Sequence, residues 1–360
     1  MSGSSLTDGL PALLSGESCV AMATLVDATG STSKKVGAKM FVGASGRILG
    51  GVTIGGCIDA RVLEAADEIV RTPSVERRLL EISLDDDEAW EIGLTCGGRV
   101  DVLVERISAD LADGADGADP VLAAYERVAD ALRRGDSAVV ATRMDGDRAR
   151  LVITPDGGAG TLGDSALNAA VAARATELLV KGASGVETID RHRVYFERQV
   201  PPVTLVIVGA GQIAMSMSRF ARELEMRSVI VDGRERYATR ARFPDADEVH
   251  VGMPSEIVAR IAPTKSVAVV LVAHDYKYEL PILRNVLRAP VGYIGLLGSK
   301  KRGAAVRQML REEGFTDEEL ARIHSPIGLN IGGNTGAEIA LSILAEIIAV
   351  RAGKRSGVAV

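Results

Sequence analysis

The sequence predicts an α/β protein: an N-terminal α/β domain built from two repeat-like units, followed by a C-terminal Rossmann-like domain with a doubly wound parallel sheet. Three observations predict it. The segments 1–110 and 120–200 carry the same order of apolar patterns. From residue 201 onward, short apolar runs alternate with stretches whose apolar residues recur at helical spacing. Glycine accounts for 39 of 360 residues and aromatics for only 3 %, which indicates many tight turns around an aliphatic core.

Two boundaries divide the chain. Residues 111–120 are small, acidic and rich in glycine and alanine, which is typical of a linker. Pro201 and Pro202 end one element directly before an apolar run. We therefore predict an N-terminal domain over 1–200, with possible duplicated halves 1–110 and 120–200, and a C-terminal Rossmann-like domain over 201–360.

The two N-terminal halves align element by element, each in the order strand, strand, helix, strand. The matching segments are 16–28 with 135–146, 38–50 with 149–160, 60–70 with 169–180, and 99–107 with 193–200. Because the identity of the matched residues is weak, a chance resemblance between two α/β units of common type is the alternative.

Three glycine-rich segments occur only in the first half, and two of them carry a cysteine. Cys57 follows Gly55 and Gly56 and opens a predicted helix, where the positive end of the helix dipole stabilises a thiolate. Cys96 stands before Gly97 and Gly98, ahead of a strand. Two such thiols could share a site that ligates a soft metal or exchanges sulfur. The alternative is a buried apolar cysteine that packs in a turn, and we interpret Cys19 in its apolar strand as a core residue.

The third segment, 30–39, holds hydroxyl side chains together with Lys34, Lys35 and Lys39. Hydroxyls and lysines beside glycines suit a phosphate or another anion. A solvated hairpin tip is the alternative.

The C-terminal elements predict a parallel sheet with covering helices. The predicted strands are 203–209, 227–232, 267–273 and 291–298, and the predicted helices are 212–225 and 339–353. The last helix is apolar enough to need cover, so we expect a homodimer, with packing inside the chain as an equal explanation.

A dinucleotide-binding fingerprint joins the first of these strands to its helix. Gly209 permits the tight turn, Gly211 lets a phosphate approach the backbone, and Ala214 lets helix and strand pack closely. Asp232, 21 residues after Gly211, ends the second strand, where an acid usually accepts hydrogen bonds from ribose and disfavours a 2′-phosphate. Arg234 and Arg236 follow it, so a 2′-phosphate stays open. The alternative is a glycine turn with a structural role only.

Further candidates fall at the predicted C-terminal ends of the strands, where open α/β sheets bind ligands. His274 and Asp275 follow one strand, and His274 could act as a general acid. The remaining candidates are Gly298, Ser299 and Lys300, as a second phosphate cradle, and Asn334 before the last helix. Turn formation and helix capping are the alternatives for each.

Composition excludes several functions. The net charge of −6 weighs against nucleic acid and anionic membranes. Three cysteines do not support a disulfide scaffold. The first residues do not show the basic region followed by an apolar region that is typical of a signal peptide. No apolar stretch is long enough to span a bilayer. We expect a soluble, cytoplasmic protein.

Taken together, the motifs resemble the XdhC/CoxI family, accessory proteins of xanthine dehydrogenase and carbon monoxide dehydrogenase. The resemblance covers most of the chain. It rests on KKVGAKM (34–40), GGCID (55–59), TCGG (95–98), VIVGAGQIA (206–214), VDGRERYATRARFPDADEV (231–249), HDYKYELPIL (274–283), YIGLLGSKKR (293–302) and HSPIGLNIGGNTGAEIALSILAEIIA (324–349). Lys34-Lys35 stands where the family often has Pro-Arg, and 330–338 also departs from the family pattern, which puts details of ligand contact in doubt.

The resemblance implies a chaperone that binds molybdenum cofactor (molybdopterin or its dinucleotide form), assists its sulfuration through a cysteine desulfurase, and hands it to an apo molybdenum hydroxylase. It makes Cys57 and Cys96 candidate contacts to molybdenum or its sulfur. It assigns Gly209, Gly211 and Asp232 to a nucleotide or to the pterin phosphate. An NAD(P)-dependent oxidoreductase is the alternative, and a thiol-based redox or metal sensor is a third hypothesis. The sequence leaves open the client enzyme, the form of the cofactor, and NAD(P) binding itself.

Overall fold

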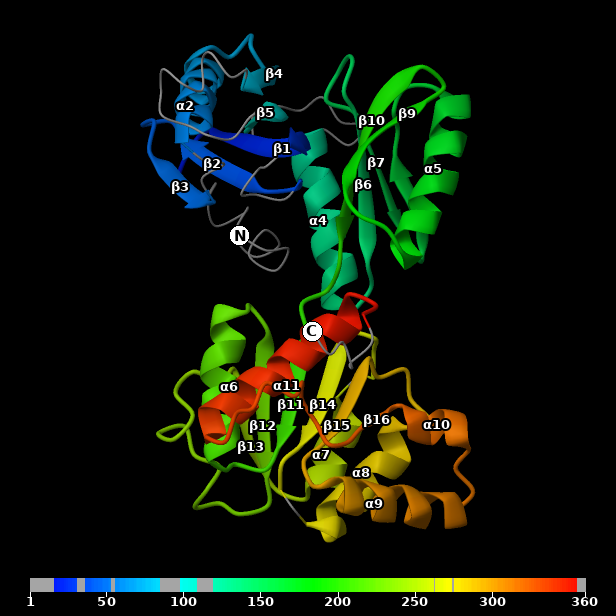
Figure 1. The fold of residues 1–360 in the computed structure, drawn as a ribbon. Helices are drawn as coiled ribbons and strands as arrows, with labels where there is room; N and C mark the ends of the chain where they lie inside the picture. The colour runs from blue at the N-terminus through cyan, green and yellow to red at the C-terminus, as the bar shows by residue number, and fades with distance from the viewer. Residues whose placement is uncertain are drawn as a thin grey trace. The chain divides into compact units, whose positions relative to one another are not determined.

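In a computed structural model the chain forms two compact units, Met1–Pro201 and Pro202–Val360 (Figure 1). The structure describes residues 16–30, 36–52, 56–84, 98–108, 119–261, 263–273 and 275–354. No helix within these ranges combines the length and the apolar character needed to cross a bilayer.

The first half of unit 1 is a five-stranded antiparallel sheet in the order β3-β2-β1-β5-β4, covered by one helix. The strands are β1 (Val20–Gly30), β2 (Lys39–Gly43), β3 (Ile48–Gly51), β4 (Arg77–Leu84) and β5 (Gly98–Ile107), and the helix is α2 (Gly56–Arg71). The apolar face of α2 packs on the sheet through Val62, Ala66 and Ile69, which are fully buried. This burial is the main stabilising term for a helix of this length.

The second half repeats this arrangement, with strand order β8-β7-β6-β10-β9 and helix α5 on the sheet. Its elements are β6 (Ala138–Arg143), β7 (Arg150–Thr154), β8 (Gly157–Gly160), α5 (Ser165–Val180), β9 (Gly185–Ile189) and β10 (His192–Gln199). Each half has five strands rather than the predicted three. β3 and β8 form hairpins with β2 and β7, and β4 and β9 are the opposite edges.

The helix α4 (Pro120–Arg133) connects the halves. The Asp119 side chain caps it by accepting a hydrogen bond from the Val121 N–H, and proline stands at its first position, where a missing N–H costs nothing. Tyr125 packs with Phe41 of the first sheet, and Val128 packs with Val140 of the second. One helix therefore shares its buried face between both sheets.

Unit 2 is a six-stranded parallel sheet in the order β13-β12-β11-β14-β15-β16, which is the Rossmann order. The strands are β11 (Thr204–Val208), β12 (Arg227–Asp232), β13 (Glu248–Val251), β14 (Val267–Leu271), β15 (Tyr293–Leu296) and β16 (Ile323–His324). The helices are α6 (Gln212–Glu223), α7 (Pro254–Arg260), α8 (Tyr276–Val286), α9 (Lys300–Glu312), α10 (Asp317–Ala321) and α11 (Gly336–Arg351).

Two separate cores cover the two faces of this sheet. Alternate residues of β11 face opposite sides: Leu205 and Ile207 join the core with α6 and α11, whereas Val206 and Val208 join the core with α7, α8 and α9. Figure 1 shows α6 and α11 side by side on one face. The predicted fold class, two repeat-like units followed by a Rossmann-like domain, is confirmed.

Candidate functional site

The glycine turn of unit 2 lies where the strand order reverses, between β11 and β14. Gly209 has a φ of +113°, and a Cβ there would come within 2.8 Å of the Ala273 backbone nitrogen. Only glycine fits, because the loops after the two strands touch at this point. Gly211 differs: a Cβ on it would meet no atom within 4 Å. The protein's own packing leaves the space beside Gly211 open.

Helix α6 begins directly after Gly211, and no side chain caps it. The first N–H groups of a helix have no partner within the helix and carry the positive end of its dipole. Ala214, the small residue of the fingerprint, is fully buried. The backbone at this turn can therefore accept an anion.

A cavity of about 140 Å³ opens at the carboxyl ends of these strands. The residues that line it are Val208, Gly209, Val231, Asp232, Gly233, Arg234, Pro254, Ala273, Asp275 and Tyr278. Three of the predicted cofactor-binding residues, Gly209, Asp232 and Asp275, thus come together in one cavity. Gly211 adjoins it in the chain. Parallel strands bring such ends to one edge of a sheet, which is where ligands of this architecture bind.

Asp232 is 4 % exposed and is held by hydrogen bonds from its own unit. It accepts from the Ala210 N–H at 2.7 Å and from both the backbone and the side chain of Arg234. Burial by itself raises the pKa of this carboxyl, but the hydrogen bonds from Arg234 and Ala210 outweigh burial and hold the pKa below its usual range. Asp232 is therefore a buried carboxylate.

The other C-terminal candidates have local structural roles. Asp275 is exposed and caps α8 through the Lys277 N–H, and Ser299 caps α9 through the Arg302 N–H. Gly298 has a φ of +154°, and Lys300 is the exposed first residue of α9. None of Gly298, Ser299 and Lys300 lines the cavity described above.

Asn334 is exposed, and its N–H donates to the Glu338 carboxylate of α11. Thr335 and Glu338 form a capping box at the start of that helix. A Cβ on Gly336 would lie 3.3 Å from Cγ of Gln212. The first turns of α6 and α11 are therefore adjacent, and Asn334 lies two residues before Gly336 in the chain.

In unit 1, the strand ends that flank the predicted motifs meet at one end of the first sheet. β1 ends at Gly30 and β4 at Leu84, and both residues pair with Gly98, the first residue of β5. β3 ends at Gly51, beside Met40 at the start of β2. The segments that carry Lys34, Gly55 and Cys96 in the sequence connect to these ends. α2 begins at Gly56, so the backbone of Cys57 lies in its first turn.

Part of the predicted site falls outside the residues that the structure describes. Lys34, Lys35, Gly55, Cys96, Gly97 and His274, and the side chain of Cys57, lie outside the described residues. Within the described part of the chain, no three His, Cys, Asp or Glu side chains group as a metal site. Cys19 is 3 % exposed and burial raises the pKa of its thiol, so it is a core residue, as expected.

A cluster of charged side chains lies at the end of the first sheet to which the motif segments connect. Arg99 follows Gly98 and binds Asp101 at 3.1 Å and Glu81 at 2.7 Å. Arg193, on β10 of the second half, binds the same two carboxylates, at 2.7 Å to Asp101. Hydrogen bonding to Asp101 raises the pKa of Arg193. The second half thus supports the strand that follows the Cys96 motif.

The expectation that Lys39 belongs to an anion loop is wrong. Lys39 is fully buried and pairs with Glu197 of β10 at 2.8 Å. Its Nζ also lies 3.2 Å from Thr24 Oγ1. Burial lowers the pKa of Lys39, and the Glu197 carboxylate opposes that shift. The Lys39 side chain therefore forms an ion pair between the two halves of unit 1.

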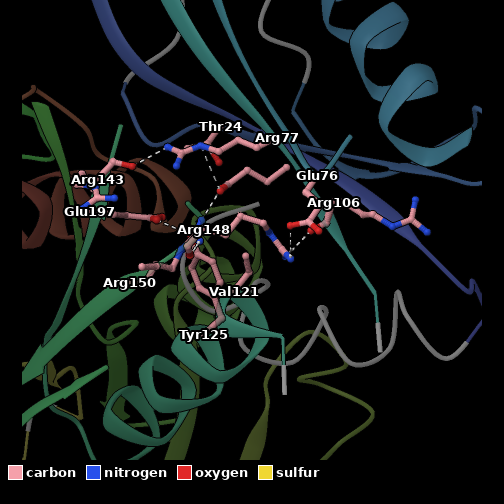
Figure 2. Close-up of polar contacts among 12 residues, drawn as sticks. Thr24, Glu76, Arg77, Arg106, Val121, Tyr125, Arg143, Arg148, Arg150 and Glu197 are labelled. Carbon is pink, nitrogen blue, oxygen red and sulfur yellow. Dashed lines mark hydrogen bonds and ion pairs between the residues drawn. The ribbon is translucent and has the colours of Figure 1, made fainter. Parts of the chain in front are cut away.

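Lys39 belongs to a larger buried network between the halves that sequence reasoning missed (Figure 2). The other ion pairs of this network join Arg150 to Glu105, Arg77 to Glu105, and Arg148 to Asp119 and Glu76. Tyr125 of α4 donates to Glu197. Figure 2 shows Arg77 of the first sheet, Arg150 and Glu197 of the second sheet and Tyr125 of α4 in one region. The available signal was charge inside apolar strands, namely Glu105 in β5 and Arg150 in β7.

Comparisons with known proteins agree along the whole chain. A family model described as "XdhC Rossmann domain" matches residues 205–347, and one described as "XdhC and CoxI family" matches residues 13–81. A probable xanthine dehydrogenase subunit of Bacillus subtilis is 26 % identical over 342 residues, which cover 95 % of this chain and 96 % of the relative. "Molybdenum cofactor insertion chaperone PaoD" of Escherichia coli is 27 % identical over 341 residues, covering 94 % and 86 %.

A solved structure extends these similarities to the fold. A crystal structure described as a xanthine dehydrogenase from Bacillus halodurans aligns with a TM-score of 0.75 and 25 % identity. The alignment covers 100 % of this chain and 98 % of that one. The similarity therefore includes both units.

Proposed function

This chain belongs to the XdhC and CoxI family, and on that premise we propose that it is an accessory chaperone for molybdenum hydroxylases. In this proposal it binds molybdenum cofactor, assists its sulfuration, and delivers it to an apo-enzyme of the xanthine dehydrogenase or carbon monoxide dehydrogenase type. The cofactor is cargo that the protein holds and releases.

One observation carries the proposal: a relative named as a molybdenum cofactor insertion chaperone aligns over 94 % of this chain. The match extends through the motifs of both units. The Bacillus subtilis relative, whose name refers to xanthine dehydrogenase, supports a client of the xanthine dehydrogenase type. We infer two partners from this role, the apo-hydroxylase and a cysteine desulfurase that supplies sulfur.

In unit 1 we assign the thiols of Cys57 and Cys96 to contacts with molybdenum or its sulfur. The pairing of Gly30 and Leu84 with Gly98 supports a shared site for the Lys34 and Cys96 segments, because it brings their flanks together. The start of α2 at Gly56 supports a thiolate at Cys57, since the first turn of a helix favours negative charge. Lys34 and Lys35, with Gly55 and Gly97, are assigned to the anionic groups of the cofactor.

In unit 2 we assign the phosphate of the cofactor, or a nucleotide, to the glycine turn and its cavity. The uncapped start of α6 and the open space at Gly211 support this, because they leave N–H donors and room for a phosphate. Molybdopterin ends in a phosphate and its dinucleotide form carries a pyrophosphate, so a Rossmann cavity suits either.

We further propose a homodimer in which α11 packs antiparallel on α11 of a second copy. Leu341 and Ile348 are exposed apolar residues of α11, 51 % and 44 % accessible, and they lie seven residues, about two turns, apart on the helix. In an antiparallel pair centred between residues 344 and 345, Leu341 meets Ile348 of the other copy and Glu338 meets Arg351. Apolar and charged positions thus complement each other under two-fold symmetry.

An NAD(P)-dependent oxidoreductase is the second candidate, and the switch-point cavity is the observation that favours it. Against it, the two cysteine motifs would have no role. Titration with NADH separates the two functions. Tight binding with turnover of a substrate supports the oxidoreductase, and binding of molybdenum cofactor without turnover supports the chaperone.

The direct test of binding uses the purified full chain and isolated molybdenum cofactor. After gel filtration, molybdenum and pterin should co-elute with the protein in near-equal amounts. Cys57→Ala and Cys96→Ala should retain less molybdenum, while Cys19→Ala, which removes a buried thiol, should retain the wild-type amount. In the free protein, Cys57 should be alkylated faster than Cys96. Loss of cofactor from the wild type on the column would refute the proposal.

A further inference from the structure

The Asp232 carboxylate is saturated by bonds within unit 2. Oδ1 accepts from the backbone N–H and from Nε of Arg234, both at 2.9 Å, and Oδ2 accepts from the Ala210 N–H and from Nη2 of Arg234, both at 2.7 Å. Two oxygens therefore accept four hydrogen bonds, which is the full capacity of a carboxylate. A ribose hydroxyl could donate to Asp232 only by displacing one of these donors.

Arg234 is held on two sides. Its fork of Nε and Nη2 faces Asp232, and its guanidinium carbon lies 4.1 Å from the centre of the Tyr237 ring. A guanidinium carries five N–H donors in one plane. Asp232 accepts one from Nε and one from Nη2, so it leaves both donors of Nη1 and the second donor of Nη2. No acceptor in the described part of the chain contacts Nη1. The side chain is 51 % exposed and lines the cavity.

The surroundings of Arg234 favour a negative ligand. The Gly209 N–H donates to the Val231 carbonyl, so the backbone donors at this edge of the sheet are those of the uncapped first turn of α6, which begins just after the glycine turn. The guanidinium of Arg242 also lies near the Tyr237 ring, 5.4 Å from its centre, and donates to the Ala210 carbonyl. Two carboxylates on the cavity lining oppose a negative ligand: Asp232, which is bonded by Arg234 and the Ala210 N–H, and Asp275, which is exposed to solvent.

We propose that Arg234 is the specificity-determining residue of this cavity, and that the cavity takes a phosphomonoester dianion. Asp232 is a positioning residue that holds the guanidinium in place. Such a phosphate can come from a 2′-phosphorylated ribose or from the terminal phosphate of a pterin. The pterin source rests on the proposed chaperone function, whereas recognition of the phosphate does not.

The test compares ligands that differ by one phosphate. Affinities of NADP⁺ and NAD⁺, and of 2′,5′-ADP and 5′-AMP, are measured by calorimetry on the full chain. A pterin arm uses oxidised pterin from molybdenum cofactor before and after phosphatase treatment. In at least one arm the phosphorylated ligand should bind about tenfold more tightly or better, as expected for a charge-assisted bidentate contact.

The variants distinguish the contribution of Arg234 from that of positive charge near the cavity in general. Arg234→Gln should abolish the preference for the phosphorylated ligand. Arg234→Lys should keep only part of it, because an ammonium cannot hold the planar pairing with Asp232 and also present a pair of N–H donors to the phosphate. Arg236→Gln removes an exposed arginine two residues away and should leave the preference intact. Asp232→Asn should weaken it without removing Arg234. Thermal unfolding checks that each variant folds.

Three outcomes would overturn the inference: equal affinities within every ligand pair, no binding in any arm, or the same loss in Arg236→Gln as in Arg234→Gln. The arms also identify the source, ribose or pterin. If the phosphate preference holds while the protein fails to retain molybdenum cofactor, the chaperone proposal fails and this inference stands.

Discussion

Lys39 and Glu197 form an ion pair of 2.8 Å between the two halves of unit 1, with side chains 0 % and 3 % exposed. Lys39 begins β2 of the first sheet, and Glu197 lies on β10 of the second. Removing one partner leaves a buried charge without compensation, which typically costs about 3–5 kcal/mol. The pair therefore makes the stability of each half depend on the other.

We predict that Lys39→Met lowers the free energy of unfolding of the full chain by several kcal/mol, measured by urea denaturation. The double variant Lys39→Met/Glu197→Leu should be less destabilised than the single one, since it leaves no unpaired charge. Arg71→Ala breaks an exposed pair with Asp67 and should change stability by less than about 1 kcal/mol. Equal effects of Lys39→Met and Arg71→Ala would contradict this role.

The two glycines of the fingerprint should respond differently to alanine. Gly209→Ala places a Cβ 2.8 Å from the Ala273 nitrogen at a φ of +113°, so it should destabilise the chain by about 1–3 kcal/mol or more. At Gly211 a Cβ meets no protein atom, so Gly211→Ala should fold within roughly 0.5 kcal/mol of the wild type. It should still weaken phosphate binding. Thermal unfolding and calorimetry measure the two effects, and a well-bound phosphate in Gly211→Ala would exclude close approach at that residue.

The contacts of Glu346 predict that the free energy of unfolding falls at acid pH. It accepts hydrogen bonds from His324, Tyr293 and the Gly328 N–H. Burial raises the pKa of this carboxyl, but those bonds outweigh burial and lower it overall. A folded pKa below the unfolded value of about 4.3 stabilises the fold above that pH, and the contribution is lost as pH falls through the folded pKa.

Glu346→Gln should therefore lower the free energy of unfolding by roughly 1–3 kcal/mol near neutral pH. The difference from the wild type should shrink below about pH 4, where the carboxylate becomes protonated. Chemical denaturation at a series of pH values measures it. A difference that stays constant down to about pH 3 would show that the charge of Glu346 does not matter.

The proposed α11 dimer predicts a change in mass. Leu341→Glu should convert the protein from dimer to monomer in gel filtration with light scattering, because a charge then replaces the apolar contact on both copies. Leu224→Glu, at an exposed apolar position after α6, is the matched control and should stay dimeric. A monomeric wild type, or a dimeric Leu341→Glu, would contradict this surface.

Much of the fold could be predicted from the sequence, and the exceptions have physical causes. The central strands are continuous apolar runs, so their pattern alone identifies them. The edge strand β8 consists of glycine and alanine, which have low strand propensity. In β3 only Ile48 and Leu49 are large and apolar, and two glycines follow them, so the apolar pattern is too short to identify a strand. They form because a hairpin partner supplies the hydrogen bonds.

The candidate site shows a similar limit. Spacing correctly placed Gly209 and Asp232 at one edge of the sheet, because strand ends in a parallel sheet meet there. Spacing could not show that Arg234 would occupy the Asp232 carboxylate, since that depends on side-chain direction. Nor could it show that Lys39 turns inward to Glu197. A lysine in a glycine-rich motif is usually solvated, and here its partner carboxylate, Glu197, comes from the second sheet.

The central claim is that this chain delivers active cofactor to a molybdenum hydroxylase. Reconstitution measures it most directly: apo-hydroxylase is mixed with limiting molybdenum cofactor, a cysteine desulfurase and cysteine, with or without this protein. We predict that the wild-type chain and Cys19→Ala raise hydroxylase activity, and that Cys57→Ala does not. No gain in activity from the wild-type chain over cofactor alone would contradict the chaperone function.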